Sequence, residues 1–326
     1  MTTAREGLWL GAAALAAMGL AGPVTAQGYP AKPIRFVITY PTGGGSDYTV
    51  RPIAQRLSER WGQPVFVESR PGGSAMIGTD FVAKSPPDGY TLMLSASSEV
   101  SMNVVLFKKM PYDPVRDLQP LTLVGTAPPL LLAHPSLPVK SVKELVALAR
   151  AKKGQLSYAS IGTGTPQHFA GELFNTTFKV DMLHIPYKGA APALIDMVGG
   201  HVPLGLTAPT VAVPHVKAGR LRALAVTSEK RSGAMPEVPT VAESGAPGFD
   251  IVQWYAIWMP AKPQKEIFEK IQGELVRIIH TPEYKQRQLE VATDIVGGSA
   301  DQLAAFQKSQ IEKYRKIAAA AGIRPE

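Results

Sequence analysis

A glycine-rich turn between an apolar run and a helical pattern is the first place in this sequence where chemistry can be expected. The turn Tyr40–Asp47 reads Tyr-Pro-Thr-Gly-Gly-Gly-Ser-Asp, follows the strand-like run Ile34–Thr39 and precedes a helical apolar spacing that begins at Val50. Backbone N–H groups at a helix N-terminus are unpaired, and the helix dipole favours negative charge there. The turn lacks the Gly-Lys-Ser/Thr ending of a phosphate-binding P-loop, so it predicts a carboxylate site. A purely structural turn is the alternative.

A second strand-to-helix junction repeats this chemistry later in the chain. The strand-like run Leu156–Ala159 leads into Ser160–Pro166, which is rich in glycine and hydroxyl groups, and a helical pattern follows. A third junction, Ser95–Ser98, adds hydroxyl groups. Ligands of open α/β sheets lie at the carboxyl ends of the strands, so we expect these loops to face one crevice.

The elements that must position these loops predict an α/β fold with largely parallel sheets. Of 326 residues, 45% are hydrophobic, and about 300 residues exceed what one compact core usually holds, so two lobes are expected. Ser141 with Glu144, and Ser299 with Gln302, have the capping-box spacing of a helix start. Helical patterns separate most of the strand-like runs, which are Ile34–Tyr40, Val65–Glu68, Thr91–Ser95, Leu121–Val124, Leu130–Ala133, Leu156–Ser160, Met182–Tyr187, Val202–Thr207 and Leu221–Thr227.

The first 26 residues predict export. Arg5 precedes the uncharged run Leu8–Gly22, which is too short for a comfortable membrane span, and Val24–Ala26 offers the small residues of a signal-peptidase site. We expect a signal peptide over residues 1–26 and a mature chain that starts near Gln27; a retained anchor is the alternative. The sequence contains no cysteine, which excludes disulfides, zinc–thiolate sites and a lipid-modified cysteine. The mature protein is therefore expected free in the periplasm.

Other kinds of site find no support in the sequence. The net charge of +8 is spread along the chain without interleaved aromatic residues, so no nucleic-acid groove is expected. The six histidines lack metal-ligand spacing, and no Ser/His/Asp set can be assembled. We expect no metal, no cofactor and no catalytic residue.

The chain resembles the substrate-binding proteins of tripartite tricarboxylate transporters, also called Bug-type receptors, from about Tyr29 to Glu326. Seven stretches occur in the family's order after Tyr29. They are Pro41–Asp47, Val67–Gly72, Pro87–Leu92, Pro111–Pro114, Ser160–Thr165, Pro186–Gly189, and Leu221–Ser228 followed by Val238–Val241.

The resemblance implies a two-lobed periplasmic-binding-protein fold of the Venus-flytrap, type II-like class. Lobe one would comprise residues 28–125 and 249–326, and lobe two residues 126–248, joined by two crossing strands. An organic carboxylate would be trapped between the lobes and handed to membrane transporter subunits by a receptor that we expect to be a monomer. The ligand-binding candidates are Thr42, Gly44, Gly45, Ser46, Asp47, Ser97, Ser98, Ser160, Thr163, Gly164, Thr165, His168, Thr207 and Ala208.

Three departures from the family pattern bear on the ligand and on the first helix. Ala75–Gly78 stands where the family commonly reads Gly-Asn-Ile-Gly, so any polar role of that asparagine is lost. Pro52 falls inside the first helix, which either bends there or effectively begins after the turn of Asp47. Thr207-Ala208 stands where many relatives have Asp-Asn, which removes a carboxylate partner for a ligand ammonium. We therefore expect a non-amino ligand, either an aliphatic dicarboxylate or an aromatic carboxylate, unless Glu99 turns inward and supplies that charge.

Two other functions stay open at this point. A ligand sensor that feeds a membrane kinase would need the same binding site, and the sequence does not separate it from a transport receptor. A hydrolase would use His168 or a serine of the crevice. The receptor is the expectation because the loops offer backbone N–H groups for binding and no assembled nucleophile.

Overall fold

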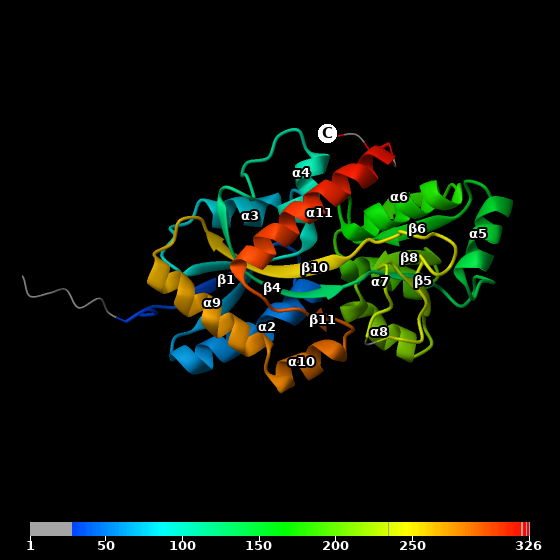
Figure 1. Cartoon of the computed structure of the whole chain (residues 1–326). Helices are drawn as coiled ribbons and strands as arrows, with labels where there is room; N and C mark the ends of the chain where they lie inside the picture. The colour runs from blue at the N-terminus through cyan, green and yellow to red at the C-terminus, as the bar shows by residue number, and fades with distance from the viewer. Residues whose placement is uncertain (1–27, 234, 321, 324, 326) are drawn as a thin grey trace, which may run out of the picture. The chain divides into compact units, whose positions relative to one another are not determined.

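The computed structural model describes residues 28–233, 235–320, 322, 323 and 325 (Figure 1). Residues Lys32–Glu326 form one compact unit. The predicted signal peptide and its cleavage site lie outside the described residues. Within the described part of the chain, no helix combines the length and apolar character needed to cross a membrane.

One sheet of six strands carries the first loop. Its order is β11-β4-β10-β3-β1-β2. The helices α3 (Met76–Ala83) and α11 (Ala300–Ala320) cover one face, and α2 (Gly45–Trp61) and α9 (Lys265–Ile279) cover the other, as Figure 1 shows above and below the sheet. The strands are β1 (Ile34–Ile38), β2 (Val65–Ser69), β3 (Thr91–Ser95), β4 (Leu118–Ala127), β10 (Gln253–Pro260) and β11 (Asp294–Ile295), and the shorter helical segments are η1 (Ser98–Met102), α4 (Asn103–Leu106) and α10 (Pro282–Leu289).

A second sheet of five strands carries the second loop. Its order is β7-β6-β8-β5-β9. The helices α5 and α6 pack into one buried apolar cluster with the sheet, and α7 and α8 pack into another. The strands are β5 (Leu130–Ala133), β6 (Ser157–Ser160), β7 (Leu183–Pro186), β8 (Leu204–Thr207) and β9 (Arg222–Val226), and the helices are α5 (Val142–Ala151), α6 (Pro166–Phe178), α7 (Ala190–Val198) and α8 (Pro209–Lys217).

Two neighbouring backbone segments connect the sheets. The chain leaves the first sheet at the end of β4 and enters β5 within three residues, and it returns from β9 to β10. The Thr227 N–H donates to the Pro129 carbonyl (3.0 Å) and the Ile251 N–H to the Thr227 carbonyl (2.8 Å), so the outgoing and returning segments are hydrogen-bonded to each other. Any movement between the sheets would have to change backbone torsions in these connecting segments.

The α/β class with two sheets is confirmed, but the sheets are mixed and not largely parallel. Four strand pairings are parallel (β1–β2, β1–β3, β6–β7 and β6–β8) and five are antiparallel (β3–β10, β4–β10, β4–β11, β5–β8 and β5–β9). The connecting strands cause the difference. Because β4 and β10 run between the sheets in opposite directions, they pair antiparallel wherever they lie side by side.

The last helix, α11, packs against residues of both sheets. Its Leu303 belongs to a buried cluster with Trp254 and Trp258 of β10, whereas Tyr314 lies in a cluster with Phe169 of α6. The Tyr314 hydroxyl also donates to the Val252 carbonyl (3.1 Å) in the returning segment. A lobe division at residues 125/126 and 248/249 stays a prediction; it assigns all of α11 to lobe one, although Tyr314 packs against Phe169 of the predicted lobe two.

The helix starts agree with the sequence in two places and differ in one. Both predicted capping boxes are present: the Glu144 N–H donates to Ser141 Oγ (3.2 Å) and the Gln302 N–H donates to Ser299 Oγ (3.2 Å). The helix α2 begins at Gly45 and continues through Pro52 to Trp61, so a start after the turn of Asp47 is wrong.

Candidate carboxylate site

A small cavity of about 50 Å³ lies between the first loop and three helix starts of the second sheet. We call it the inner cavity. It adjoins an outer cavity of about 560 Å³, with which it shares Tyr40, Pro41, Ile161, Lys188 and Gly189. A single water needs roughly 10–15 Å³ by the same measure, so the inner cavity has room for a group the size of a carboxylate. The outer cavity has room for the remainder of an organic molecule.

Four helix N-termini converge on the inner cavity. Its lining includes Gly44–Ser46 at the start of α2, Pro166 of α6, Gly189–Pro192 at the start of α7, and Ala208 before α8. Each N-terminus carries about half a positive charge and unpaired backbone N–H groups. The inner cavity is therefore suited to an anion through backbone dipoles, and no acidic side chain is among its lining residues.

The glycines of the first loop serve different purposes. Gly43 has a φ of +80°, a conformation that L side chains rarely adopt. Gly44 has an ordinary extended backbone (φ −93°), and a Cβ there would meet only the Pro41 carbonyl at 3.5 Å. A Cβ on Gly45 would clash with the Tyr255 hydroxyl and approach Thr210 Oγ1 to 2.9 Å. Gly43 thus shapes the turn, Gly44 leaves space on the cavity side, and Gly45 lets α2 approach β10 and α8.

Asp47 fixes the first loop from behind. Its Oδ2 accepts a hydrogen bond from the Gly43 N–H (3.1 Å), and its Oδ1 pairs with Arg51 Nε (2.9 Å) one turn further along α2. Both oxygens of the Asp47 carboxylate therefore already have a partner, one in the loop backbone and one in Arg51.

The second loop is held by its own hydroxyl groups. Thr165 caps α6 by accepting from the His168 N–H (3.3 Å), and its Oγ1 donates to the Gly162 carbonyl (2.7 Å). Ser160 Oγ accepts from the Gly162 N–H (3.1 Å) and lies 2.6 Å from His184 Nε2. These bonds hold the loop in a shape that needs positive φ at Gly162 (+140°) and Gly164 (+76°).

His168 lies in a stack of rings beneath the second loop. The ring centroids of His168 and His184 are 4.2 Å apart and the rings are nearly parallel, and the Tyr158 ring also stacks on His184, at 5.1 Å. The Gly164 N–H donates to His168 Nδ1 (3.3 Å). Burial, with a smaller contribution from His168, lowers the pKa of His184 to about 4. His168 thus supports the loop from behind and is absent from the lining of both cavities.

The third junction, Ser95–Ser98, reaches the inner cavity with Ala96, and the carboxyl group of Glu99 lies behind it. Ala96 lines the cavity, whereas Ser97 and Ser98 are fully buried and line neither cavity. Glu99 is also fully buried, and its Oε1 accepts from Thr39 Oγ1 (2.5 Å) and from the Ala96 N–H (2.8 Å). Burial raises the pKa of Glu99 to about 7.

The structure brings half of the candidate residues to the two cavities. Those that line the inner cavity are Thr42, Gly44, Gly45, Ser46 and Ala208. Thr163 and Thr165 line the outer cavity. The remaining candidates stand behind the lining, namely Asp47, Ser97, Ser98, Ser160, Gly164, His168 and Thr207.

Two groups of lining residues were not among the candidates. Lys188–Pro192 line the inner cavity, and Gly72–Ala75 line the outer cavity. The motif Pro186–Gly189 was a usable signal, because a glycine before a helical pattern again marks a helix start, and Gly189 has a φ of +114°. Gln253 was also missed; it accepts from Gln167 Nε2 (2.6 Å) of α6 and donates to the Tyr255 hydroxyl, which links the two sheets at the cavity.

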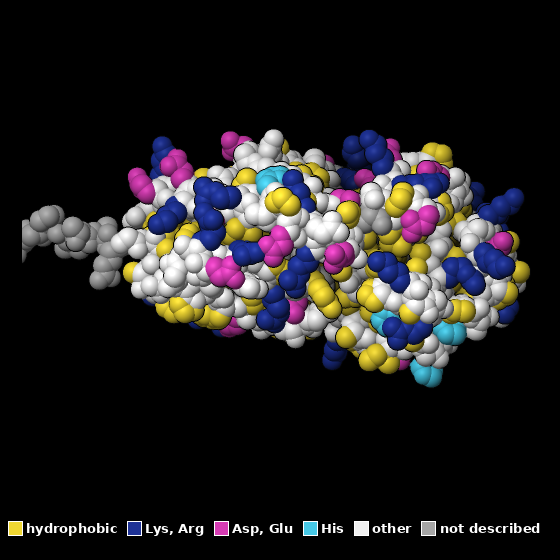
Figure 2. Space-filling model, turned by 90° about the horizontal axis from the view of Figure 1, so that it is seen from below, with side chains coloured by type: hydrophobic (Ala, Val, Ile, Leu, Met, Phe, Trp, Pro, Cys, Tyr) yellow, Lys and Arg dark blue, Asp and Glu magenta, His cyan; other side chains and the backbone are white. Residues whose placement is uncertain are grey.

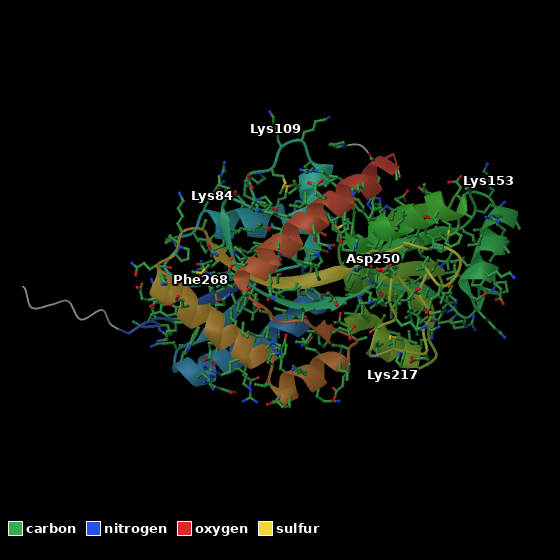
Figure 3. All side chains as sticks on the ribbon, viewed as in Figure 1. Lys84, Lys109, Lys153, Lys217, Asp250 and Phe268 are labelled. Atoms are coloured by element: carbon green, nitrogen blue, oxygen red, sulfur yellow. The ribbon has the colours of Figure 1, made fainter. Side chains whose placement is uncertain are left out.

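On the face of the described residues that Figure 2 shows, the basic side chains are dispersed. In Figure 2, lysine and arginine side chains are scattered over the visible face and interspersed with acidic ones. Figure 3 shows Lys84, Lys109, Lys153 and Lys217 pointing outward from separate parts of the molecule. This distribution agrees with solvated surface charge and gives no stripe that would follow a nucleic-acid backbone.

Comparisons with known proteins agree with this geometry. Residues 49–323 match the family model described as tripartite tricarboxylate transporter family receptor. Protein BugT of Bordetella pertussis is 34% identical over 304 residues, which are 93% of this chain and 93% of that protein. The structure of R. palustris Rpa4515 with adipate is 32% identical with a TM-score of 0.88, covering 91% of this chain and 100% of that one.

Two further solved structures show the same fold. Periplasmic binding protein BugD is 30% identical with a TM-score of 0.86, and it covers 91% of this chain and 100% of that one. MatC from Rhodopseudomonas palustris with bound malate is 26% identical with a TM-score of 0.83, and it covers 89% of this chain and 99% of that one. Receptors of this family bind solutes and are not enzymes, which removes the hydrolase alternative. The chain belongs to the receptors of the tripartite tricarboxylate transporter family.

Proposed function

We propose that this receptor captures a non-amino organic carboxylate in the periplasm and delivers it to a transporter of the tripartite tricarboxylate type. The observation that carries the proposal is the inner cavity, where four helix N-termini meet and no acidic side chain lines the surface. One ligand carboxylate would lie against Gly44–Ser46 and Gly189–Ala191, with its charge balanced by helix dipoles.

Two relatives support this ligand class. The structure of Rpa4515 holds adipate and that of MatC holds malate, and both compounds are dicarboxylates without an amino group. The outer cavity, with Lys188 and the hydroxyl groups of Thr163 and Thr165 on its lining, has polar groups for the second end of such a molecule. Aromatic carboxylates remain the other non-amino candidates, because the outer cavity also has apolar lining at Pro71 and Ile161.

An amino acid is disfavoured by charge. Its ammonium group would leave water on binding, and a buried charge without a partner costs several kcal/mol. Asp47 is already paired with Arg51, and Glu99 lies behind Thr39 and Ala96 and is absent from the lining. The inner cavity therefore offers no free carboxylate to an ammonium.

A thermal-shift panel of mono-, di- and aromatic carboxylates together with amino acids tests the proposal. A ligand that binds only the folded protein stabilises it by about 2.7 kcal/mol at a hundredfold excess over its dissociation constant. We expect at least one non-amino carboxylate to raise the melting temperature in proportion to the logarithm of its concentration. Stabilisation by an amino acid, with no response to any non-amino carboxylate, would contradict the proposal.

A further inference from the structure

Glu99 is a buried carboxyl group separated from the inner cavity by a single layer of residues. Its Oε1 is bonded to Thr39 Oγ1 (2.5 Å) and to the Ala96 N–H (2.8 Å). Ala96 and Tyr40, the residue after Thr39, both line the inner cavity, and Thr39 itself lines the outer one. A charge on Glu99 therefore acts on a ligand in the cavity through the low-dielectric protein interior.

No lysine, arginine or histidine among the described residues forms an ion pair with this carboxyl group. The Oε2 atom of Glu99 also has no hydrogen-bond partner in the described part of the chain. The titratable groups that face it are Tyr40 after β1, Tyr112 after α4 and Tyr255 of β10. Burial raises the pKa of all three tyrosines above the usual value, so they stay neutral at physiological pH. From α11, Gln307 brings a neutral amide to η1, where its Nε2 donates to the Val100 carbonyl, and Tyr314 brings a hydroxyl group to Ser97 just before this turn.

The backbone holds Glu99 in this place. It lies in the π-helical turn η1, directly after β3. The Tyr112 hydroxyl donates to the Glu99 carbonyl (2.7 Å), and Gln307 Nε2 donates to the Val100 carbonyl (2.8 Å). π-helical turns occur frequently at functional sites. Because both anchors come from other elements, the carboxyl group cannot move away from the cavity without breaking buried hydrogen bonds.

The inner cavity, which Lys188 also lines, therefore has a site for one anion in front of a buried carboxyl group that forms no ion pair with any described residue. We propose that capture of the organic anion is coupled to uptake of one proton by Glu99, so that the receptor binds an anion and a proton together. The inference rests on the proposed function, because it requires an anion in the inner cavity. Burial places the pKa of Glu99 near 7 without ligand, so both protonation states are populated around neutral pH.

The sign of the pH dependence follows from linkage. A bound anion repels the Glu99 carboxylate and raises the pKa of Glu99 further. Affinity is then constant below the ligand-free pKa and decreases as the pH rises above it, by at most about tenfold per pH unit, until the ligand-bound pKa is reached. Proton uptake on binding is greatest between these two pKa values.

Calorimetry with adipate as the probe tests the coupling. Titrations at pH 7.5 in two buffers of different ionisation enthalpy give the number of protons taken up, and a series between about pH 6.5 and 8.5, where adipate stays ionised, gives the affinity profile. We expect net uptake of up to one proton by the wild type and an affinity that falls by about tenfold across the series. Glu99→Gln should take up no proton at this site and bind adipate with a flat profile.

Asp294→Asn is the matched control, because Asp294 is a half-buried acid whose pKa is also raised by burial and which lies away from both cavities, beside Ser232. It should behave as the wild type. The coupling is overturned if adipate binds the wild type without proton uptake, and this measurement does not depend on whether Glu99→Gln folds. Uptake that persists in Glu99→Gln, or is lost equally in Asp294→Asn, overturns the assignment to Glu99. If adipate and every other carboxylate of the panel fail to bind at any pH, the proposed function fails, and the coupling fails with it.

Discussion

At the scale of single residues, the glycines of the first loop matter as much as the residues that carry side chains. Gly43, Gly44 and Gly45 are adjacent, yet only Gly43 needs a conformation that glycine favours. Gly44 has dihedral angles that any residue can adopt, and its missing Cβ leaves the backbone N–H groups of the α2 start open to the cavity. Binding and folding can therefore be separated at Gly44.

We predict that Gly44→Val weakens carboxylate binding strongly and changes the stability little. A Val side chain would fill the space in which an anion reaches the backbone, and the loss of two charge-assisted hydrogen bonds corresponds to about 3 kcal/mol, roughly a hundredfold in affinity. Gly273→Val in α9 is the matched control, because it also has no close neighbours and lies outside both cavities. Calorimetry and thermal unfolding of both variants provide the test. Unchanged affinity in Gly44→Val would reduce the first loop to a structural turn.

A second prediction at this scale concerns stability and does not depend on a ligand. Burial raises the pKa of Glu99 from its ordinary value of 4.5 to about 7 in the folded protein. The burial penalty of the anion is therefore absent below pH 4.5 and grows as the pH rises to 7, where it reaches about 3 kcal/mol. Glu99→Gln should accordingly gain stability over the wild type at pH 8 and lose this advantage at pH 5. Chemical denaturation at both pH values checks this; a difference that does not change with pH would show that the pKa of Glu99 is not raised.

At the scale of elements, the site is a set of helix starts, and the cap of α6 is the one that can be altered without entering the inner cavity. Thr165 accepts from the His168 N–H and donates to the Gly162 carbonyl, so it orders both the helix and the second loop. Ser141 caps α5 by the same kind of bond, with the Glu144 N–H, but lies outside both cavities.

We predict that Thr165→Ala and Ser141→Ala each destabilise the protein by about 1 kcal/mol, the usual cost of a lost N-cap. Only Thr165→Ala should also weaken carboxylate binding, by up to about tenfold, because the second loop must then be ordered when the ligand binds. Urea denaturation together with calorimetry measures both effects. Equal affinities in the two variants would show that the second loop takes no part in binding.

Sequence patterns predict elements well here and predict contacts between elements poorly. Each of the nine strand-like runs contains or overlaps a strand, because alternating or continuous apolar character is a local property. The mixed strand directions escaped prediction, because β4 and β10 pair across more than a hundred residues. Thr42, Gly44, Gly45 and Ser46 belong to a glycine-rich turn that the local sequence indicates, whereas Gln253 reaches the cavity only through the crossing of the chain between the sheets.

At the scale of the whole molecule, the predicted export signal lies before the part of the chain that the structure describes. We predict that periplasmic protein begins near Gln27, because Val24–Ala26 offers small residues at the −3 and −1 positions of a cleavage site. Intact-mass measurement of protein released from the periplasm checks this. Recovery of the chain with Met1–Ala26 still attached would favour the retained anchor.

The largest-scale prediction is that ligand binding closes the two halves of the site. The lining comes from both sheets, so each half offers only part of the hydrogen bonds that a carboxylate needs. In the structure the start of α2 lies close to α8. A Cβ added at Gly45 would collide with the Tyr255 hydroxyl and with Thr210 Oγ1 of α8. Without a ligand, the helix N-termini of the two sheets face one another with like partial charges and repel each other. This repulsion favours a more open arrangement, in which the sheets separate by rotation at the connecting segments.

Small-angle scattering should therefore show a smaller radius of gyration when saturating adipate is added to the wild type. Gly45→Val places a branched side chain where α2, β10 and α8 meet, so this variant should keep the larger radius and bind adipate weakly. Gly273→Val again serves as the control and should close as the wild type does. If the wild type binds adipate with no change in radius, and Gly45→Val has that same radius and affinity, the approach of α2 to α8 is a fixed packing contact and binding does not drive closure.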